Sequence, residues 1–461
     1  MTLIKSISGI RGTIGGKINK NLTPFEAVKF GCAYGVWLKR NSNKNKLKVV
    51  IGRDARISGE MIQNFVQNSL ISLGINVIDL GLSTTPTVEL MVKEYHADGG
   101  IIITASHNPA EWNALKLLDK YGEFLDNNSG EEIVKISESD DYVFSEVYDL
   151  GTITKMNNTM KTHIDSVLKL DLVNTDLIRK TKLKVVIDAV NSSGGIIVPL
   201  LLNELNIDYS CIYCKPTGDF QHNPEPLKEN LTELCKKVVE EKADLGIAVD
   251  PDVDRLVFVC ENGEIFGEEN TLVACADYVL SKNPGSTVSN LSSTRGLKDV
   301  TEKQGQSYYA SAVGEVNVVN KMKECNAVIG GEGNGGVIYP ESHYGRDAIV
   351  GIGLFLSLLI EKNISVSELL SIYPKYKMVK EKINLSKEID VDKILNKLAI
   401  KYNNENINET DGLKVDFKDS WVHLRKSNTE PIIRIYGEGK SEEIANSLVN
   451  QIKLDIKELS N

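Results

Sequence analysis

The stretch Leu47-Lys-Val-Val-Ile51, followed by Gly-Arg-Asp-Ala-Arg-Ile-Ser-Gly, decides the fold class. A helical pattern at residues 61–73 comes next and leads into a second apolar run, Asn76-Val-Ile-Asp-Leu80. Gly99-Gly-Ile-Ile-Ile103 is a third apolar run of strand length. Continuous apolar strands need helices on both faces, and strands that alternate with helices form mainly parallel sheets. The sequence therefore predicts an α/β fold.

A weak internal repeat indicates that the chain holds several such units. Leu183-Lys-Val-Val-Ile187 is again followed by a turn of small residues and an apolar segment. We expect a third unit between residues 263 and 374, with a strand at 327–329 and a helix at 347–361.

The pattern changes after Tyr373. A helix is expected at 390–403, and a polar stretch follows at 404–410. Two short alternating strands, at 421–425 and 432–436, then flank a polar loop. A helix at 441–459 closes the chain. These elements predict a small α+β domain.

Composition and charge exclude several classes of function. The chain has 461 residues, of which 41% are hydrophobic and 25% charged, as in ordinary globular proteins. Its 53 basic and 63 acidic residues give a net charge of -10, which argues against binding to nucleic acids or anionic membranes. Residues 1–11 lack the features of an export signal, and the longest apolar stretch, 350–360, is too short to span a bilayer.

Seven cysteines are scattered along the chain, and an odd number cannot all pair with one another. This usage predicts a reducing compartment, the cytoplasm. Cys211-Ile-Tyr-Cys214 has the spacing of zinc and redox motifs. Because no second cysteine pair follows and the segment is typical of a strand, we assign it neither role.

The loop Thr104-Ala-Ser-His-Asn-Pro109 directly follows an apolar strand. Open α/β sheets place their sites at the carboxyl ends of parallel strands. Ser106 can act there as a nucleophile, with His107 or Lys116 as a neighbouring basic group. A polar turn between a strand and a helix is the alternative interpretation.

The loop Asp250-Pro-Asp-Val-Asp-Arg255 lies between two apolar runs, 243–249 and 256–259. Three carboxylates at alternate positions can converge on one hard cation such as Mg²⁺ and leave sites open for a phosphate oxygen and water. A solvated acidic turn is the alternative. A calcium EF-hand is excluded, because Arg255 stands where that loop needs Gly and a strand follows instead of a helix.

The loop Gly330-Gly-Glu-Gly-Asn-Gly-Gly336 contains a formal G-x-G-x-x-G. We reject a dinucleotide site, because the following Val-Ile-Tyr-Pro does not begin a helix and Glu332 would repel a pyrophosphate. One carboxylate and one amide suit sugar hydroxyls, since Glu332 accepts hydrogen bonds and Asn334 both accepts and donates them. A plain flexible turn is the alternative.

The loop Arg425-Lys-Ser-Asn-Thr-Glu-Pro431 gathers hydrogen-bond donors between two short strands. Arg425 offers a bidentate fork, and Ser427, Asn428 and Thr429 add further donors to a phosphate dianion. An ordinary hairpin loop is the alternative.

These four loops, in this order, resemble those of the α-D-phosphohexomutase family across nearly the whole chain. The resemblance implies an α/β protein with three related mixed-sheet α/β domains and a smaller C-terminal α+β domain around a central cleft. The expected domain limits are 1–152 with the phosphoserine loop, 153–258 with the metal loop, 259–374 with the sugar-binding loop and 375–461 with the phosphate-binding loop.

The resemblance also implies a role for each loop residue. Ser106 would carry the phosphoryl group and join Asp250, Asp252 and Asp254 in binding one Mg²⁺ per chain. The residues expected to be catalytic are Ser106, His107, Lys116, Arg255 and Arg11. Those expected to bind the sugar are Glu332, Asn334, Thr294 and Arg295, and those expected to bind phosphate are Arg425, Ser427, Asn428 and Thr429.

Three departures from the family pattern stand out. Pro251 and Val253 occupy places where the metal loop usually has glycine, but the three carboxylates remain. Asn334 and Gly336 replace the usual Ser and His of the sugar loop, and Glu315 stands where several members have His. The last two departures concern which sugar is bound.

The implied reaction moves a phosphoryl group between the C1 and C6 hydroxyls of a hexose, through phosphorylated Ser106 and a sugar bisphosphate that also serves as activator. Glucosamine phosphate is the leading substrate hypothesis, and mannose and glucose phosphates stay open. The alternatives are a metal-dependent sugar phosphatase, which would not need a second phosphate clamp, and a non-catalytic sensor. We expect a cytoplasmic isomerase, monomeric or homodimeric, with a hexose phosphate as substrate.

Overall fold

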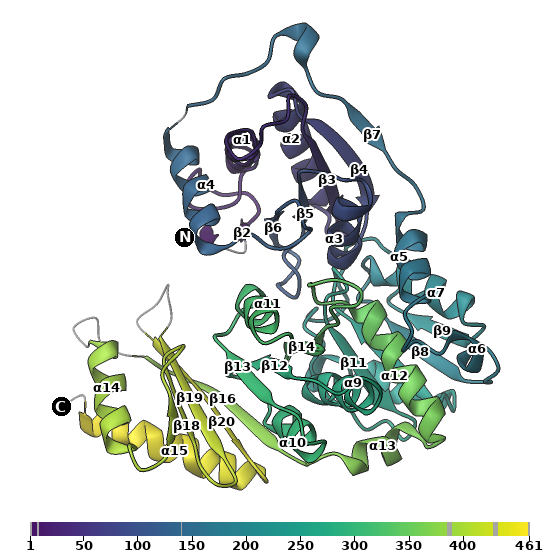
Figure 1. The fold of residues 1–461 in the computed structure, drawn as a ribbon, viewed down its shortest axis with the longest axis vertical. Helices are drawn as coiled ribbons and strands as arrows, with labels where there is room; N and C mark the ends of the chain where they lie inside the picture. Colours follow the sequence, from purple (N-terminus) through teal and green to yellow (C-terminus); the bar gives the residue numbers. More distant parts are fainter. Residues whose placement is uncertain (1, 7–8, 140, 385–389, 427–431, 460–461) are drawn as a thin grey trace. The chain divides into compact units, whose positions relative to one another are not determined.

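The computed structural model describes residues 2–6, 9–139, 141–384, 390–426 and 432–459 (Figure 1). By its internal contacts the chain divides into two units. Unit 1 comprises Met1–Tyr278 and Gly335–Leu370, and unit 2 comprises Val279–Asn334 and Ser371–Asn461. Each unit is therefore assembled from two separate stretches of sequence.

The N-terminal sheet has, within the described residues, seven strands in the order β1-β2-β6-β5-β3-β4-β7. The central strand β3 pairs in parallel with β4 and β5, whereas β6 is antiparallel to both β5 and β2. The strands are β1 (Ile4–Ser6), β2 (Gly9–Thr13), β3 (Lys48–Arg53), β4 (Asn76–Leu82), β5 (Gly99–Ile103), β6 (Trp112–Leu118) and β7 (Ile153–Lys155).

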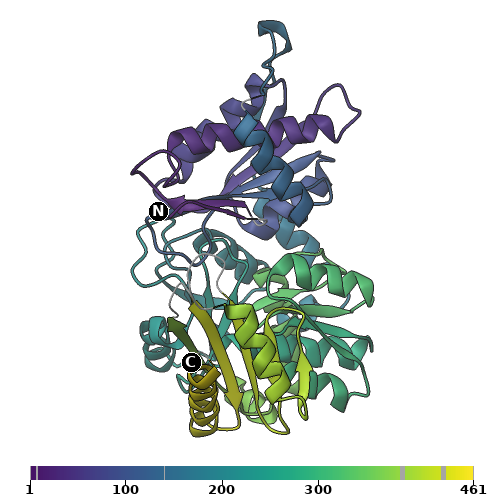
Figure 2. The ribbon, with the colours of Figure 1, turned by 90° about the vertical axis from the view of Figure 1, so that its left-hand side faces the viewer.

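Helices cover both faces of this sheet (Figures 1 and 2). Val49 and Ile51 of β3 pack in one apolar cluster with α1 (Pro24–Arg40), α2 (Gly59–Ser72) and α4 (Asn127–Ser139). Val50, which points to the opposite face, packs in a second cluster with α3 (Thr85–Glu94). The continuous apolar run is therefore explained by burial on both sides, and the predicted α/β fold is confirmed.

The two following sheets repeat the order found in β6-β5-β3-β4. One runs β11-β10-β8-β9 and the other β15-β14-β12-β13. In the first of these, β10, β8 and β9 are parallel and β11 is antiparallel, as in the N-terminal sheet. The internal repeat is thus confirmed. The strands are β8 (Lys184–Asp188), β9 (Asp208–Ile212), β10 (Leu245–Val249), β11 (Leu256–Cys260), β12 (Thr287–Asn290), β13 (Tyr308–Ser311), β14 (Ile329–Glu332) and β15 (Gly336–Ile338).

Helices and short helical turns connect these strands. They are η1 (Val147–Asp149), α5 (Thr159–Val167), α6 (Thr175–Ile178), α7 (Gly194–Glu204), η2 (Lys228–Asn230), α8 (Thr232–Glu240), α9 (Glu268–Lys282), α10 (Gly296–Lys303), α11 (Glu315–Glu324), α12 (Ala348–Lys362) and α13 (Val366–Ile372). The helix expected at 347–361 is α12, and Asp347 caps its first turn by accepting from the backbone N–H groups of Ile349 and Val350.

The C-terminal sheet is antiparallel and runs β16-β20-β19-β18-β17. Both C-terminal helices contribute to one apolar cluster with it, so they cover the same face (Figure 1). This is the smaller α+β domain that the sequence predicts. Its elements are β16 (Lys377–Asn384), α14 (Val391–Lys401), β17 (Asn406–Asn408), β18 (Leu413–Asp416), β19 (Trp421–Lys426), β20 (Ile432–Gly439) and α15 (Glu442–Leu459).

One sequence prediction was wrong in detail. The strand expected at 327–329 begins only at Ile329, because the N–H of Ala327 instead bonds the carbonyl of Met322 at the end of α11. The stretch 404–410, predicted to be polar, contains β17, which among the described strands pairs with β18 alone at the edge of the sheet. A strand on an exposed edge can be polar, so its sequence carries no apolar alternation.

Among the described helices no single one is both long and apolar enough to cross a membrane. Together α12 and α13 have sufficient length and apolar composition, but the chain bends by 90° at their junction.

Three phenylalanines in unit 1 provide a test of core packing. Phe355 of α12 is fully buried, stacks on Phe258 with ring centroids 3.7 Å apart, and meets the Phe266 ring edge-on at 5.2 Å. We expect Phe355→Ala to destabilise the protein by about 3–5 kcal/mol through lost burial and a cavity, as measured by guanidinium unfolding. Phe25→Ala, at an exposed position, is the control; equal unfolding midpoints for the two variants would contradict this packing.

Candidate active site

The first three predicted loops occupy the same place in the three related sheets. The Ser106 loop joins β5 to β6, the aspartate loop 250–255 joins β10 to β11, and the glycine-rich loop joins β14 to β15. Each begins at the carboxyl end of a strand that has a parallel neighbour. The alternative of a strand-to-helix turn at Ser106 is therefore wrong, since a strand follows. A strand, β11, also follows the aspartate loop, as the rejection of an EF-hand requires.

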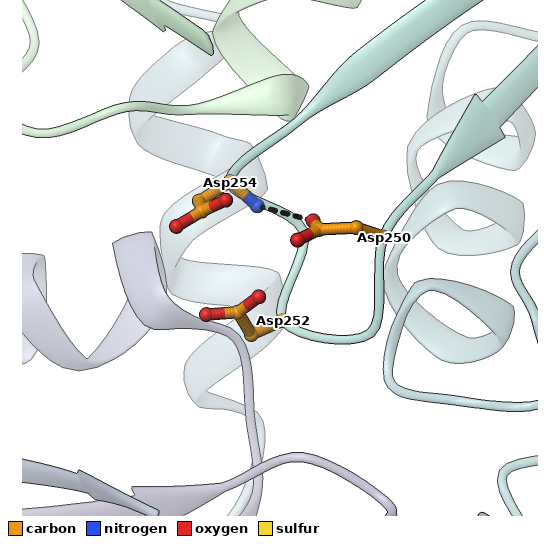
Figure 3. A group of neighbouring side chains, drawn as sticks. All are labelled: Asp250, Asp252 and Asp254. Carbon is orange, nitrogen blue, oxygen red and sulfur yellow. Dashed lines mark hydrogen bonds between the residues drawn. The ribbon is translucent and has the colours of Figure 1, made fainter. Parts of the chain in front are cut away.

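The aspartate loop folds back on itself (Figure 3). Asp250 Oδ1 accepts hydrogen bonds from the backbone N–H groups of Asp254 and Arg255, both at 3.1 Å. Val253 adopts φ +64°, a left-handed conformation that strains a β-branched residue. The three carboxylates are fully buried, and one oxygen atom of each lies within 4.8 Å of the others.

This cluster fits a hard divalent cation. Among the described residues, Oδ1 of Asp252 and Oδ1 of Asp254 are buried without a hydrogen-bond donor. Burial, and then the charges of Asp254 and Asp252, hold the pKa of Asp250 well above its usual range. Unpaired buried carboxylate oxygens are costly, and carboxylates are ligands that Mg²⁺ and Ca²⁺ prefer. The solvated acidic turn is therefore wrong for this loop.

Ser106 lies against the cluster. Its hydroxyl donates to Asp250 Oδ2 at 2.7 Å, and its backbone adopts φ +48°. His107 Nδ1 is 3.4 Å from the same hydroxyl oxygen. Burial, followed by the charges of Arg255 and Arg11, lowers the pKa of His107 to about 2, so its imidazole is neutral.

Cationic side chains surround the carboxylates. Lys116 of β6 places Nζ 2.7 Å from Asp252 Oδ2 and 3.4 Å from Asp254 Oδ2. Burial alone would lower the pKa of Lys116, but the two carboxylates outweigh it and raise the pKa above its usual value. Lys116 is therefore an ammonium group in this arrangement.

Two arginines expected near Ser106 have partners of their own. Arg255 donates to Glu225 Oε1 at 3.0 Å, and Arg11 donates to the Asn108 side-chain oxygen at 3.0 Å. Burial, and then the charge of Arg255, lowers the pKa of Arg11. The hydrogen bond from Arg11 joins β2 to the Ser106 loop.

Sequence reasoning missed Arg56, which supports the serine loop from within. Its fully buried guanidinium donates to the backbone carbonyls of Ser106 at 2.5 Å and Asn108 at 2.6 Å. It also donates to the carbonyls of Pro109 and Trp112, and its Nε bonds Asp54 at 3.0 Å. The only sequence signal was a basic residue in the turn after the first repeat strand.

Two further partners of the aspartates were also missed. Arg346 donates to Asp254 Oδ2 at 2.6 Å, and Thr85 donates to Asp252 Oδ2 at 2.6 Å. Both side chains belong to segments distant in sequence from the aspartate loop. No local pattern around either residue distinguishes it from an ordinary helix start.

The residues expected to bind sugar lie in unit 2. Glu332 is buried, and its Oε1 accepts from Asn290 Nδ2 at 2.8 Å and from the Gly314 N–H at 3.2 Å. Asn334 Nδ2 donates to Glu332 Oε2 at 3.3 Å, so the structure brings these two together. The glycine-rich loop is followed by β15 and not by a helix, in agreement with the rejection of a dinucleotide site.

Thr294 and Arg295 lie at the start of α10. The Thr294 hydroxyl accepts from the Gly296 N–H at 3.2 Å, and the Arg295 N–H donates to Glu438 Oε1 at 3.0 Å. The Arg295 guanidinium lies 6.0 Å from the centre of the Tyr376 ring. Both residues therefore belong to a part of unit 2 that β20 helps to hold in place.

The expected phosphate loop is described only at its start. Arg425 Nε lies 2.8 Å from Asp411 Oδ2, which pairs the guanidinium with a carboxylate. Ser427, Asn428 and Thr429 lie outside the described residues. Their expected role in binding phosphate stays a prediction.

Comparison with known proteins gives a consistent result along the chain. Four models of phosphoglucomutase/phosphomannomutase domains match it: α/β/α domain I at residues 3–143, domain II at 161–263, domain III at 268–376 and the C-terminal domain at 378–454.

Individual relatives agree with these matches. The chain is 37% identical to a phosphoglucomutase/phosphomannomutase of Thermococcus kodakarensis, over 94% of this chain and 95% of the relative. It is 34% identical to a phosphoglucosamine/phosphogalactosamine mutase of Sulfurisphaera tokodaii, over 96% and 97%. A crystal structure of a phosphoglucomutase/phosphomannomutase family protein from Burkholderia thailandensis superposes with a TM-score of 0.85 at 24% identity, covering 99% of this chain and 97% of that one, and so shares its fold.

Binding of Mg²⁺ to the aspartate cluster can be tested without a substrate. We expect Mg²⁺ to raise the melting temperature, because a ligand at 100 times its dissociation constant stabilises the folded state by about 2.7 kcal/mol. Asp250→Asn keeps an Oδ1 acceptor but removes one of three mutually repelling charges. It should therefore abolish the Mg²⁺-dependent gain, without lowering stability in the metal-free protein.

Asp208→Asn, at an exposed position on β9, serves as the matched control and should keep the full response. A Mg²⁺ response that survives Asp250→Asn would show that the cation binds elsewhere. Differential scanning calorimetry with and without Mg²⁺ measures both effects.

Proposed function

The chain belongs to the α-D-phosphohexomutase family, and we propose that it interconverts a hexose 6-phosphate and the corresponding 1-phosphate through phosphorylated Ser106. Its relatives are mutases, and the chain is an isomerase of the same family. The family that the sequence resembles is thus confirmed. The observation that carries the proposed mechanism is the hydrogen bond from the Ser106 hydroxyl to Asp250 inside the buried aspartate cluster.

In the proposed reaction the phosphoryl group passes from Ser106 Oγ to a sugar hydroxyl, and the Oγ–P bond breaks as the new O–P bond forms. The bisphosphorylated sugar then returns its other phosphoryl group to Ser106. His107 and Lys116 are the groups that we propose for moving the hydroxyl proton. The ammonium form of Lys116 suits proton return better than proton removal, and the lowered pKa of His107 makes its neutral imidazole a weak base.

Phosphoryl transfer requires in-line positioning and neutralised charge. Mg²⁺, when bound by Asp250, Asp252 and Asp254, would draw negative charge from the phosphoryl oxygens. Among the chain's own groups, Arg11 and Arg255 add positive charge next to the serine loop, as their effect on the His107 pKa indicates. Arg56 fixes the loop backbone, so that Ser106 Oγ does not have to be ordered during the reaction.

For the sugar we propose Glu332 and Asn334, with Thr294 and Arg295 as further contacts, and for the phosphate Arg425, Ser427, Asn428 and Thr429. Glu332 supports this role because it is a buried carboxylate at the carboxyl end of a sheet strand. We also propose the domain limits 1–152, 153–258, 259–374 and 375–461, one loop to each domain.

The proposed substrate is glucosamine 6-phosphate, with mannose and glucose phosphates as alternatives. The name of the Sulfurisphaera tokodaii relative supports an amino sugar, whereas that of the Thermococcus kodakarensis relative supports the alternatives. A charged acceptor such as Glu332 binds an ammonium substituent more strongly than a hydroxyl.

We expect glucosamine 6-phosphate to give the highest kcat/KM when the three sugar 6-phosphates are offered in parallel and 1-phosphate formation is measured. Glu332→Gln should lower this value by about tenfold or more for glucosamine 6-phosphate, since a charge-assisted hydrogen bond is weakened. A smaller loss is expected for glucose 6-phosphate. Equal losses for both sugars would contradict a specific contact with the amino group.

We expect Ser106→Ala to lower mutase activity by at least about 1,000-fold, because the group that carries the phosphoryl is lost. Ser137→Ala, which removes a buried hydroxyl of α4, is the matched control and should stay active. Release of inorganic phosphate is measured in the same samples. Phosphate release that exceeds isomer formation in the wild type would favour the sugar phosphatase instead.

A further inference from the structure

A buried network of histidines and carboxylates lies in unit 1, apart from the residues assigned above. His163 Nε2 is 2.8 Å and His343 Nε2 is 3.1 Å from the same atom, Asp347 Oδ2. His343 Nδ1 lies 3.2 Å from Glu89 Oε2, and His163 Nδ1 lies 2.9 Å from Thr87 Oγ1. None of these side chains is more than 3% exposed. Buried polar groups of this kind are stable only as a connected set.

Asp347 links this network to the aspartate loop. Its other oxygen, Oδ1, caps α12 by accepting from two backbone N–H groups, so both carboxylate oxygens are engaged. The residue before it, Arg346, donates to Asp254 Oδ2 at 2.6 Å, and the N–H of the residue after it, Ala348, donates to the Val253 carbonyl at 3.2 Å. Holding Asp347 in place therefore holds two contacts to the aspartate loop.

The network also joins three helices. Thr87 and Glu89 belong to α3, His163 to α5, and Asp347 begins α12. The first residue of α3, Thr85, donates to Asp252 Oδ2 at 2.6 Å. The histidines therefore connect α3, which supplies Thr85, to the start of α12, which Arg346 precedes.

The charge of His343 suits this bridging position. Two carboxylates face it, Glu89 from α3 and Asp347 from the start of α12, and His163 of α5 contacts the same oxygen of Asp347. Burial alone would lower the pKa of His343, but the two carboxylates outweigh it and raise the pKa to about 9. The imidazole is therefore protonated at neutral pH. Gly345 leaves room for this pair, because a Cβ there would lie 1.9 Å from Glu89 Oε2.

We propose that His343 is a positioning residue for the cation site: by bridging Glu89 and Asp347 it fixes the start of α12 and so aims Arg346 at Asp254. This inference rests on the proposed function, because it concerns the loop that would bind Mg²⁺ in the mutase. The contacts described for His343 are with Glu89 and Asp347, and not with the proposed cation ligands or Ser106.

A double-mutant cycle tests the coupling. His343→Gln, Arg346→Gln and the double variant are purified, and Mg²⁺ binding to each is measured by isothermal titration calorimetry. His343→Gln should weaken Mg²⁺ binding by about tenfold, as is common for residues that orient metal ligands. In the Arg346→Gln background the same change should have an effect of less than about twofold. Equal effects in both backgrounds, or unchanged Mg²⁺ affinity with only a lower melting temperature, would overturn the proposal.

The pH profile gives an independent readout. Because the pKa of His343 is raised from 6.5 to about 9 by folding, its stabilising effect is complete below pH 6.5 and is lost as pH rises through about 9. The difference in melting temperature between wild type and His343→Gln should therefore shrink across that interval. A difference that stays constant to pH 10 would contradict the bridging imidazolium.

Two further variants keep the test decisive. If His343→Gln does not fold, Glu89→Gln removes one charge of the network at constant size, and it should weaken Mg²⁺ binding in the same Arg346-dependent way. His423→Gln, at a buried histidine of unit 2, is the matched control and should bind Mg²⁺ like the wild type. Failure of the wild type itself to bind Mg²⁺ would refute the proposed cation site as well, whereas normal binding by every variant would refute only the role of His343.

Discussion

Three carboxylates confined to one five-residue loop and removed from water form the constraint on which unit 1 depends. Such a cluster opposes folding, because each buried anion loses its hydration and is repelled by the other two. The compensating groups come from separate parts of the chain: Lys116 from β6, Thr85 from α3 and Arg346 from the start of α12. The loop can therefore keep its shape only when all three elements are in place. A carboxylate cluster that opposes folding is expected where the protein binds a cation. It does not serve to stabilise the fold.

The three related sheets use one structural position for three kinds of chemistry. The Ser106 hydroxyl, the carboxylates of the aspartate loop and the Glu332 carboxylate each lie at the carboxyl end of the strand that corresponds to β5 in its own sheet. At this position a side chain is supported by a parallel neighbour and is free of the helices that cover both faces of the sheet. Repetition of one α/β unit therefore supplied three equivalent turns, which differ in the residues that they present.

The sequence was informative where chemistry and local pattern coincide. β5 has the predicted limits. The aspartates were recognisable because they are close neighbours in the chain, and Ser106 because its loop directly follows an apolar strand. Arg56 could not be recognised in this way, since its guanidinium binds carbonyls about fifty positions further along. Arg346 and Thr85 were missed for the same reason. The edge strand β17 was missed because a strand with one partner needs no apolar face. Contacts between distant segments, and not local propensity, account for what the sequence left undetermined.

The backbone of the aspartate loop shows why a departure from the family pattern is tolerated. Val253 stands where glycine is usual and adopts φ +64°, which costs on the order of 1–3 kcal/mol for a side chain of this type. Its side chain is fully buried, so part of that cost is offset by removal of apolar surface from water. The Val253 carbonyl accepts a hydrogen bond from the Ala348 N–H. The backbone N–H groups of the next two residues, Asp254 and Arg255, donate to Asp250 Oδ1. A valine has fewer accessible backbone conformations than a glycine, so less conformational freedom is lost when this loop becomes ordered. This restriction lowers the ordering cost of binding, and it makes the strained residue compatible with a functional site.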